Sequence, residues 1–568
     1  MIATTVRTGQ RTLAVGLLCL LGCAEEAAEV ADAAAADDTA ESNTDWTFGG
    51  ETAVTTSLGD LIGAQADLDT LVWRGVPFAQ PPVGLLRWRA PQPPQAWAGE
   101  RDVRMLAPLC PQQRADGLPT SEDCLYLNVW RPHTAELDLP VFMWIHGGGN
   151  RNAAPSTHEV DGAQLAADGN VIVVTINYRV NYLGFLTHPA LRADAGDDLD
   201  SASGNFGLLD QIQAMKWIRD HIADFGGDPD RVTIGGQSAG ARNTLAHIIS
   251  PLSAGLFHRA LVMSGRRTVD PVAGFDATAE AMFGELLALV GEDSGSLSDA
   301  QLVEVARAQS AGAIATLGAA GTFNLIADGH VLPEQGFEVL ESGDYNQVPM
   351  IIGMTREEPK YRFSDIPDLL RQQQVYQDAS VLMSDLQKVD GRDAVLRSLA
   401  AQQGQQGQPA AYGYDFAWGS SLEDGTAPVS DYFAFRLGAF HTLDVPFFFG
   451  TDRVHVQAAE FMWQEANVEG REALSSVMRG YLANLIHTGD PNEGPLADRI
   501  VEPWTAWVAE EGGEKIMELH GDMRASRERM IAQEHTIDGV SRDVETFDME
   551  TCATVVAMTT IDNDILCQ

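Results

Sequence analysis

The chain has 568 residues, of which 45% are hydrophobic and 21% are charged, a composition typical of a globular protein with a large core. Its 37 Lys and Arg residues face 80 Asp and Glu residues, so the formal net charge is −43 at pH 7. A surface this acidic repels phosphate groups, which excludes nucleic acid as an expected partner. We interpret the acidity as a source of solubility and not as a signal of substrate.

The first 22 residues are predicted to form a signal peptide. Their apolar run, Leu13–Leu21, follows two arginines and is shorter than the roughly 20 residues of a membrane-spanning helix. The stretch LLGC, Leu20–Cys23, resembles a bacterial lipoprotein processing site, after which Cys23 would carry the lipid. An ordinary secretory signal cut near Ala24 is the alternative. Both interpretations predict export. In the lipoprotein interpretation, Cys23 is the only membrane contact and the cell envelope is the expected location.

Residues 23–45 are predicted to form an acidic, Ala-rich tether. They contain almost no large apolar side chains, so they cannot bury enough surface to fold alone. A short surface helix is the alternative, and it would serve the same spacer role.

Four cysteines remain once Cys19, in the signal peptide, and Cys23 are set aside. An even number in an exported protein predicts two local disulfides as the simplest pairing. Each would close a loop of about 15 residues and stabilise the fold by roughly 3 kcal/mol. A metal site is not expected, because no CxxC or His-rich spacing accompanies them. The four cysteines are Cys110, Cys124, Cys552 and Cys567.

Strand-like and helical segments alternate from Trp46 onward, without a long linker or an internal repeat. The apolar runs Leu139–Gly149 and Asn170–Arg179 are typical of strands buried on both faces. Leu208–Gly226 has helical spacing and ends in a glycine stop signal, and Arg231–Gly236 is again strand-like. This order predicts an α/β sheet with crossover helices.

Helical patterns dominate the later chain, at 270–342, 365–403 and 457–486. They lie between strand-like segments such as Val348–Thr355. Length alone would favour two or more domains. We expect instead that these helices are insertions that cover one sheet.

The pentapeptide Gly236–Gly240 reads GQSAG and lies between a predicted strand and a predicted helix. This context is typical of a nucleophile elbow, in which a strained turn presents the serine and the glycines allow close backbone approach. The pattern predicts Ser238 as a nucleophile; a polar residue in a tight turn is the alternative. An activated serine also needs an oxyanion site, and the stretch IHGGGN, Ile145–Asn150, offers backbone N–H groups for one, with the N–H of Ala239 completing it.

Long, ordered stretches of the chain resemble the type-B carboxylesterases, the α/β-hydrolase family that includes the cholinesterases. The resemblance runs from about Val72 to about Trp507. It implies an α/β-hydrolase fold in a single domain, 46–568, that cleaves small carboxylic esters through an acyl-enzyme without a metal or cofactor. The stretches are Arg74–Trp88, Ser121–Trp130, the HGGG run, Ile176–Leu186, Gly204–Gln211, Phe225–Ala241 and Leu256–Gly265.

The resemblance also implies a catalytic triad in the order Ser, Glu, His. The segment Ile351–Phe363 matches the one that holds the acid, which makes Glu358 the triad acid. Pro359 stands where the family commonly has glycine, so Glu357 remains an alternative. The segment Gly438–Gly450 makes His441 the base. By the same match, the oxyanion donors are Gly148, Gly149 and Ala239.

Several residues match structural positions of the family. Arg74 and Glu122 match a buried ion pair, Cys110 and Cys124 match the first disulfide, and Ser264 matches a hydrogen-bond donor behind the active site. Four later histidines lack the catalytic pattern, and we expect surface or core roles for them: His455, His487, His520 and His535.

The substrate is less defined. The loop between Cys110 and Cys124 has no aromatic residue, and Gln237 occupies a position that is acidic in cholinesterases, so a choline ester is not expected. Arg151 follows the glycine run and is a candidate contact for an anionic group; a surface charge is the alternative. Lipase, thioesterase and amidase activities of the same fold stay open, as does a non-catalytic binding protein.

Overall fold

The computed structural model describes residues 52–536, except 114–117, 153–159, 294–296, 319–322, 402–408, 423–424, 455–460 and 509–512. The predicted signal peptide, the tether, Cys23, His455, Cys552 and Cys567 lie outside the described residues. In the part of the chain that the structure describes, no helix combines the length and the apolar character needed to cross a membrane.

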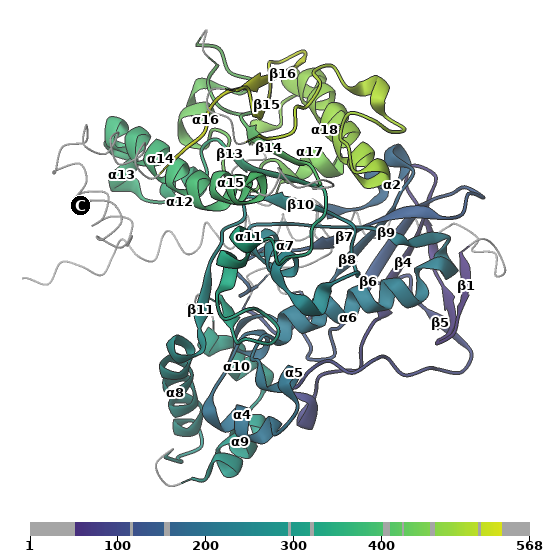
Figure 1. Ribbon diagram of the computed structural model, residues 1–568, viewed down its shortest axis with the longest axis vertical. Coiled ribbons are helices and arrows are strands. Elements are labelled where there is room, and N and C mark those ends of the chain that lie inside the picture. The colour runs from purple at the N-terminus through teal and green to yellow at the C-terminus, as the bar shows by residue number, and fades with distance from the viewer. Residues whose placement is uncertain are drawn as a thin grey trace, which may run out of the picture. The chain divides into compact units, whose positions relative to one another are not determined.

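One mixed sheet runs through the molecule (Figure 1). Across the described ranges it has eleven strands in the order β16-β15-β14-β13-β10-β9-β7-β8-β6-β4-β3. The strands from β15 to β8 are parallel, and antiparallel strands flank them. The bounds are β3 (Ala64–Ala66), β4 (Thr70–Pro77), β6 (Tyr126–Pro132), β7 (Leu139–Ile145), β8 (Ile172–Ile176), β9 (Gly227–Gln237), β10 (Arg259–Met263), β13 (Met350–Thr355), β14 (Ala411–Phe416), β15 (Ile516–Gly521) and β16 (Ser526–Ile531).

The central strands are apolar throughout because both faces of the sheet are covered. In β7, Val141 and Met143 belong to one hydrophobic core, whereas Phe142 and Trp144 belong to the other. Helices α6 and α7 pack on the first face, and α2, α17 and α18 pack on the second (Figure 1). The alternation of side chains along each strand therefore divides the apolar residues between two cores.

The helices differ in length and in place. Crossover and covering helices are α2 (Ala163–Gly169), α3 (Asn181–Gly184), α4 (Pro189–Ala195), α5 (Leu199–Ala202), α6 (Phe206–His221), α7 (Ala239–Ile249), α11 (Val339–Ser342), α15 (Ala394–Ala400), α17 (Val445–Phe449) and α18 (Val468–Thr488). Further helices are α8 (Val272–Ala288), α9 (Asp299–Ala308), α10 (Ala311–Leu317), α12 (Lys360–Phe363), α13 (Pro367–Arg371), α14 (Gln373–Lys388) and α16 (Asp431–Arg436). A π-helical turn, Val389–Asp393, joins α14 to α15.

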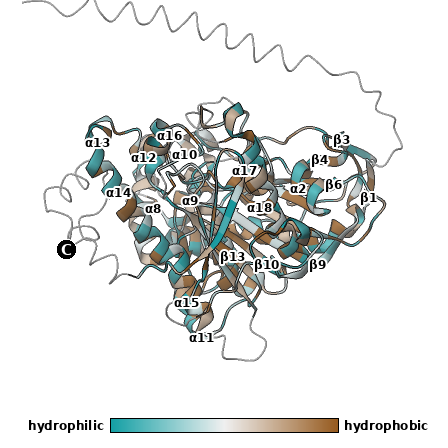
Figure 2. Ribbon diagram, turned by 90° about the horizontal axis from the view of Figure 1, so that it is seen from above, coloured by the Kyte–Doolittle hydropathy of each residue, from teal (hydrophilic) through white to brown (hydrophobic). Residues whose placement is uncertain are grey.

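The helical insertions carry small cores of their own. Residues of α4, α8, α9 and α10 pack together, and residues of α12, α13 and α14 form a second cluster. Figure 2 shows both hydrophilic and hydrophobic residues on α14, as expected for a helix with one buried face. Two small sheets complete the described elements, one of β1 (Ala53–Thr56), β2 (Gly59–Ile62) and β5 (Glu100–Asp102), the other of β11 (Val269–Pro271) and β12 (Leu325–Ala327).

The predicted elements agree with the structure at the level of existence and type. The expected strands at 139–149, 170–179, 231–236 and 348–355 correspond to β7, β8, β9 and β13, and the expected helix at 208–226 corresponds to α6. The largely helical interpretation of 270–342 missed β12, which is only three residues long and pairs with β11 alone. A strand this short has too few residues to show an alternating pattern.

Candidate active site

Ser238 lies in the sharp turn between β9 and α7. Its backbone has φ 58° and ψ −119°, a conformation that residues with a side chain rarely adopt. Glycine is required on both sides of this serine because no side chain fits there. A Cβ on Gly236 would lie 2.5 Å from the Gly240 carbonyl carbon, and a Cβ on Gly240 would lie 2.0 Å from the Ile145 carbonyl oxygen. The turn thus has the strain and the close backbone packing of a nucleophile elbow.

Glu358 is fully buried behind this turn and makes four hydrogen-bond contacts. Its Oε1 accepts from Ser264 Oγ at 2.5 Å and from the Thr355 N–H at 2.8 Å, and its Oε2 contacts Nδ1 of His441. Its backbone carbonyl also accepts from the His441 N–H at 3.4 Å. Burial opposes ionisation, but His441 and the hydrogen bonds outweigh it and hold the pKa of Glu358 below its usual value.

Glu357, the alternative acid, faces other partners. Its carboxylate binds Lys360 Nζ at 2.5 Å and accepts from the Ala439 N–H at 2.8 Å. Pro359 causes no break, because it takes φ −83° just before the short helix α12. Of the two glutamates it is therefore Glu358 that contacts the histidine.

His441 is held from three sides. Glu358 takes its Nδ1, the ring of Tyr361 stacks on it with centroids 5.5 Å apart, and the Gln237 amide nitrogen lies 3.1 Å from Nε2. These contacts assign a proton to Nδ1 and leave Nε2 as an acceptor. A histidine with a free lone pair on Nε2 is in the state required of a general base.

The hydrogen bond between Ser238 and His441 is not formed. Within the described residues, Gln237 and not the Ser238 hydroxyl occupies Nε2 of His441. Catalytic hydrogen bonds are often long or absent without substrate and tighten only in the complex. The structure therefore brings acid and base together and places the serine in the adjacent turn, one residue after Gln237.

The glycine run lies directly against the nucleophile turn. A Cβ on Gly147 would come 2.8 Å from the Gln237 carbonyl oxygen and 3.2 Å from the Ser238 Cβ. Gly148 and Gly149 have φ 89° and 69°, which favours glycine at both positions. No other described residue binds the N–H groups of Gly148, Gly149 or Ala239. These three donors are the candidates for an oxyanion site.

A buried polar cluster fixes this run and was not found by sequence reasoning. Asn150 is fully buried, and its amide exchanges hydrogen bonds with Asn243 at 3.0 and 3.1 Å and accepts from Tyr178 Oη at 3.1 Å. The Tyr178 ring also stacks on His146, with centroids 4.2 Å apart. In the sequence this cluster is visible only as an asparagine after the glycines, and an asparagine alone does not reveal its partners.

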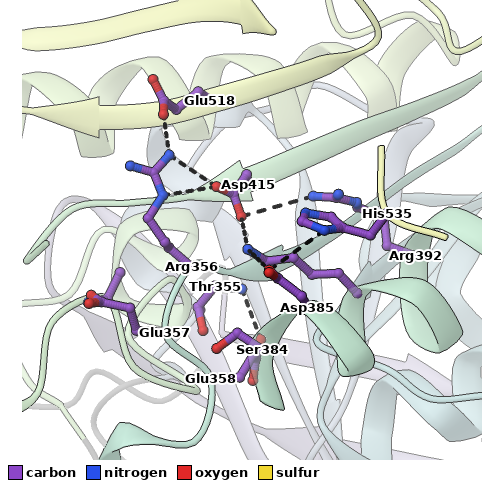
Figure 3. A network of polar contacts seen from close by, with 12 residues as sticks. Thr355, Arg356, Glu357, Glu358, Ser384, Asp385, Arg392, Asp415, Glu518 and His535 are labelled. Carbon is purple, nitrogen blue, oxygen red and sulfur yellow. Dashed lines mark hydrogen bonds and ion pairs between the residues drawn. The ribbon is translucent and has the colours of Figure 1, made fainter. Parts of the chain in front are cut away.

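The end of β13 sends successive side chains to different partners (Figure 3). Arg356 pairs with Asp415 at 3.0 Å and with Glu518, while Glu358 turns toward His441. Asp415 is fully buried and also lies 3.3 Å from Lys388 Nζ. Burial raises the pKa of Asp415, but Lys388, Arg356 and Arg392 outweigh it and hold that pKa well below its usual range. The network anchors the segment that carries the acid.

The other structural expectations have mixed outcomes. Cys110 and Cys124 form a disulfide, and Ser264 donates to Glu358, as the resemblance implied. The expected pair between Arg74 and Glu122 is wrong. Glu122 instead binds Arg87, in a bidentate contact at 2.5 and 2.7 Å. Arg87 is positioned for this pair because its guanidinium is also held by the carbonyls of Arg307 and Gln309.

The later histidines that are described make structural contacts. His487 lies 2.9 Å from the Gly169 carbonyl oxygen, His520 lies 3.3 Å from Glu518, and His535 lies 3.6 Å from Asp385. Their nearest partners are therefore not residues of the triad.

The carboxylesterase family model matches residues 50–390, more than half of the chain. The chain belongs to the carboxylesterase family. The para-nitrobenzyl esterase of Bacillus subtilis (strain 168) is 32% identical over 462 residues, which cover 77% of this chain and 90% of that enzyme. The fumonisin B1 esterase of Sphingopyxis macrogoltabida is 38% identical over 313 residues, 53% of this chain and 55% of that relative. The chain thus spans about half the length of several curated carboxylesterases that it matches.

Solved carboxylesterase structures extend the match along the chain. A PNB esterase superposes with a TM-score of 0.65 and 28% identity, covering 85% of this chain and 98% of that one. A carboxylesterase from Geobacillus stearothermophilus gives a TM-score of 0.66 and 29% identity, with 84% and 97% covered. The large mixed sheet with helices on both faces is therefore the α/β-hydrolase fold, which confirms the predicted fold class.

Proposed function

We propose that this carboxylesterase family member hydrolyses carboxylic esters with Ser238 as nucleophile, His441 as general base and Glu358 as the acid that orients the base. The observation that carries the proposal is the contact of the buried Glu358 with Nδ1 of His441, beside the strained turn that holds Ser238. The esterase names of the relatives support the same reaction class.

The first half-reaction begins when the Ser238 hydroxyl attacks the ester carbonyl and His441 takes the hydroxyl proton at Nε2. Gln237 must release Nε2 for this step, since its amide lies 3.1 Å away. Glu358 stabilises the imidazolium, and the N–H groups of Gly148, Gly149 and Ala239 bind the oxyanion. His441 then returns the proton to the departing alcohol, which leaves an acyl group on Ser238.

The second half-reaction uses water in place of the serine hydroxyl. His441 removes a proton from the water, the water oxygen attacks the acyl carbonyl, and the proton passes back to the Ser238 oxygen as the acid departs. All of these proton transfers involve the same ring nitrogen, which the Glu358 contact leaves available.

The test is turnover of p-nitrophenyl acetate, butyrate and palmitate by the wild type, by Ser238→Ala and by Ser342→Ala, an exposed serine that serves as the control. We expect Ser238→Ala to lose about 10³-fold or more in kcat, because no other group replaces the nucleophile. A fluorophosphonate should label Ser238 in the wild type. A folded protein that neither cleaves these esters nor takes the label would overturn the proposal, and a preference for emulsified palmitate would point to a lipase.

We also propose that the protein is exported and anchored through a lipid on Cys23. The support is the LLGC stretch and the acidic tether that follows it. Replacing Cys23 by Ser should move the protein from the membrane fraction to the soluble fraction of the cell envelope or the medium. Unchanged partitioning would end the proposal.

A further inference from the structure

Arginines gather at the edge of the sheet where Ser238 lies. Strands β7, β9, β10 and β13 are parallel neighbours, so their carboxyl ends meet at one edge. At least one arginine follows each of these four strands. Apart from Arg356, which follows β13 and pairs with Asp415 and Glu518, they are Arg151 after β7, Arg242 in α7 after β9, Arg266 and Arg267 after β10, and Arg362 after β13.

The charges of two of these arginines influence Tyr361, whose ring stacks on His441. Arg362 donates from Nε to Tyr361 Oη at 2.5 Å, and its guanidinium lies 5.2 Å from the centre of that ring. Tyr361 stacks in turn on His441. Burial raises the pKa of Tyr361, and the charges of Arg362 and Arg151 both oppose that rise. Arg362 therefore lies directly against this hydroxyl group, and Arg151 follows β7, on the other side of Ser238.

Arg242 lies one helical turn after the nucleophile. Its N–H donates to the Ser238 carbonyl at 2.9 Å, and its side chain is nine-tenths buried. The guanidinium is held by neutral oxygens only, the Phe323 carbonyl and Asn324 Oδ1, each at 2.7 Å. Burial lowers the pKa of Arg242 to about 10, with Arg266 contributing to that fall, so Arg242 remains a cation at neutral pH.

Glu357 and Glu358 also follow β13 at this edge, but the five arginines have few carboxylate partners. Arg266 and Arg267 share one carboxylate, Asp390, at 3.6 Å each, and no other carboxylate of the described ranges pairs with any of the five arginines. Glu358 is committed to His441, and the residue before the nucleophile is the neutral Gln237. In a chain with a net charge of −43, these five arginines thus share a single carboxylate as ion-pair partner among the described residues.

We infer that the substrates of this site are esters that carry a free carboxylate. The inference rests on the proposed ester hydrolysis at Ser238. The acidic surface as a whole repels an anion, but salt screens that repulsion beyond about 8 Å at physiological ionic strength, whereas guanidinium groups inside the site act at shorter range. Arginine also offers a planar, bidentate match to a carboxylate.

The test compares esters that differ only in charge. On the acyl side the pair is p-nitrophenyl hydrogen glutarate and its methyl ester; on the alcohol side it is 4-acetoxybenzoate and its methyl ester. We expect the ratio of kcat/KM, anionic over neutral, to exceed about 10 for one of the two pairs, and to fall as NaCl is raised from 20 to 300 mM. The pair with the higher ratio tells which side of the substrate carries the carboxylate.

Variants assign the effect to residues. Arg151→Gln, Arg266→Gln and Arg362→Gln should each lower that ratio about three- to tenfold. Arg219→Gln is the matched control: Arg219 lies in the last turn of α6, which precedes β9 and so ends at the opposite edge of the sheet, and the ratio should not change. Thermal melting of each variant identifies loss of folding.

Two failures are distinguishable. Turnover of the neutral esters with a ratio near or below 1 for both pairs, or an equal response to Arg219→Gln, would overturn the anionic substrate and leave the proposed function intact. Absence of any turnover, with no fluorophosphonate label on Ser238, would overturn both.

Discussion

Two groups of cations in the molecule differ in how they are paired with carboxylates. In the buried network around Asp415, Arg356, Lys388 and Arg392 each face at least one carboxylate within 4 Å. Figure 3 shows Asp415 with Arg356 and Arg392. At the site edge, two of the five arginines, Arg266 and Arg267, share Asp390, and no other described carboxylate pairs with any of the five.

The difference follows from the cost of desolvation. A buried charge without a partner is penalised by several kcal/mol, so the network must be paired to exist at all. Arg151, Arg266 and Arg362 are largely exposed, and water supplies most of what a partner would. Arg242 is buried without a carboxylate but keeps two oxygen acceptors. Arg151 and Arg362, which are exposed and pair with no described carboxylate, are therefore the cations at this edge most available to a ligand.

Breaking the buried network should give the largest effect on stability. Asp415→Asn removes the carboxylate that faces Arg356, Lys388 and Arg392, so we expect unfolding to become easier by about 3–5 kcal/mol. Chemical denaturation measures the change.

A substitution at the site edge, Arg151→Gln, is the matched comparison for Asp415→Asn. Arg151→Gln also alters one charge, but no described carboxylate pairs with Arg151, and the unfolding free energy should change by less than about 0.5 kcal/mol. Equal effects of Asp415→Asn and Arg151→Gln would contradict the distinction between the two groups.

Asp444 is a buried carboxyl group that pairs with no described cation. It is fully buried near the triad, and its Oδ2 accepts from Tyr414 Oη at 2.7 Å. Burial raises its pKa from 3.8 to about 7, and the charge of Glu358 adds to that rise. Between these two pH values the folded state keeps a proton that the unfolded state loses, so Asp444 reduces the unfolding free energy as pH rises from about 4 to 7.

Asp444→Asn should therefore stabilise the protein at pH 8 by about 1–3 kcal/mol, because the amide accepts the Tyr414 hydrogen bond without a buried charge. At pH 4 the same variant should differ little from the wild type. Denaturation midpoints at the two pH values test this. A gain that is equal at both would show that the carboxyl group does not titrate between them.

The sequence predicted the site better than it predicted the surroundings. The turn at Ser238 and the glycine run are contiguous stretches whose chemistry requires particular residues at fixed spacing, so Ser238 could be singled out from the residues themselves. Glu358 and His441 could be named only through the resemblance to the carboxylesterases. The α/β order of the strands was visible for the same reason, because strands buried on both faces are uniformly apolar.

Long-range partnerships were not visible. Arg74 and Arg87 lie in one matched stretch, and nothing local tells which of them reaches Glu122; the structure gives Arg87, which α9 and the residue after it also hold through carbonyl oxygens. The contact of Gln237 with His441 joins residues 204 apart in the chain. Pairings of this kind depend on how insertions fold back, which residue pattern alone does not specify.

Gln237→Glu sharpens the comparison further, because it adds a carboxylate to the site edge. Gln237→Glu would place a negative charge near Nε2 of His441, where the neutral amide now lies 3.1 Å away. We expect the anionic-to-neutral ratio of kcat/KM to fall about three- to tenfold, since the new charge opposes the arginines.

Gln237→Met separates charge from the loss of a hydrogen bond, because it removes the amide and adds no charge. The methionine variant should keep the wild-type preference between charged and neutral esters even if its turnover changes. If Gln237→Glu leaves that preference as it was, the cations at this edge do not select the substrate. The unpaired arginines would then be no more than exposed charges, and the contrast with the buried network would concern stability alone.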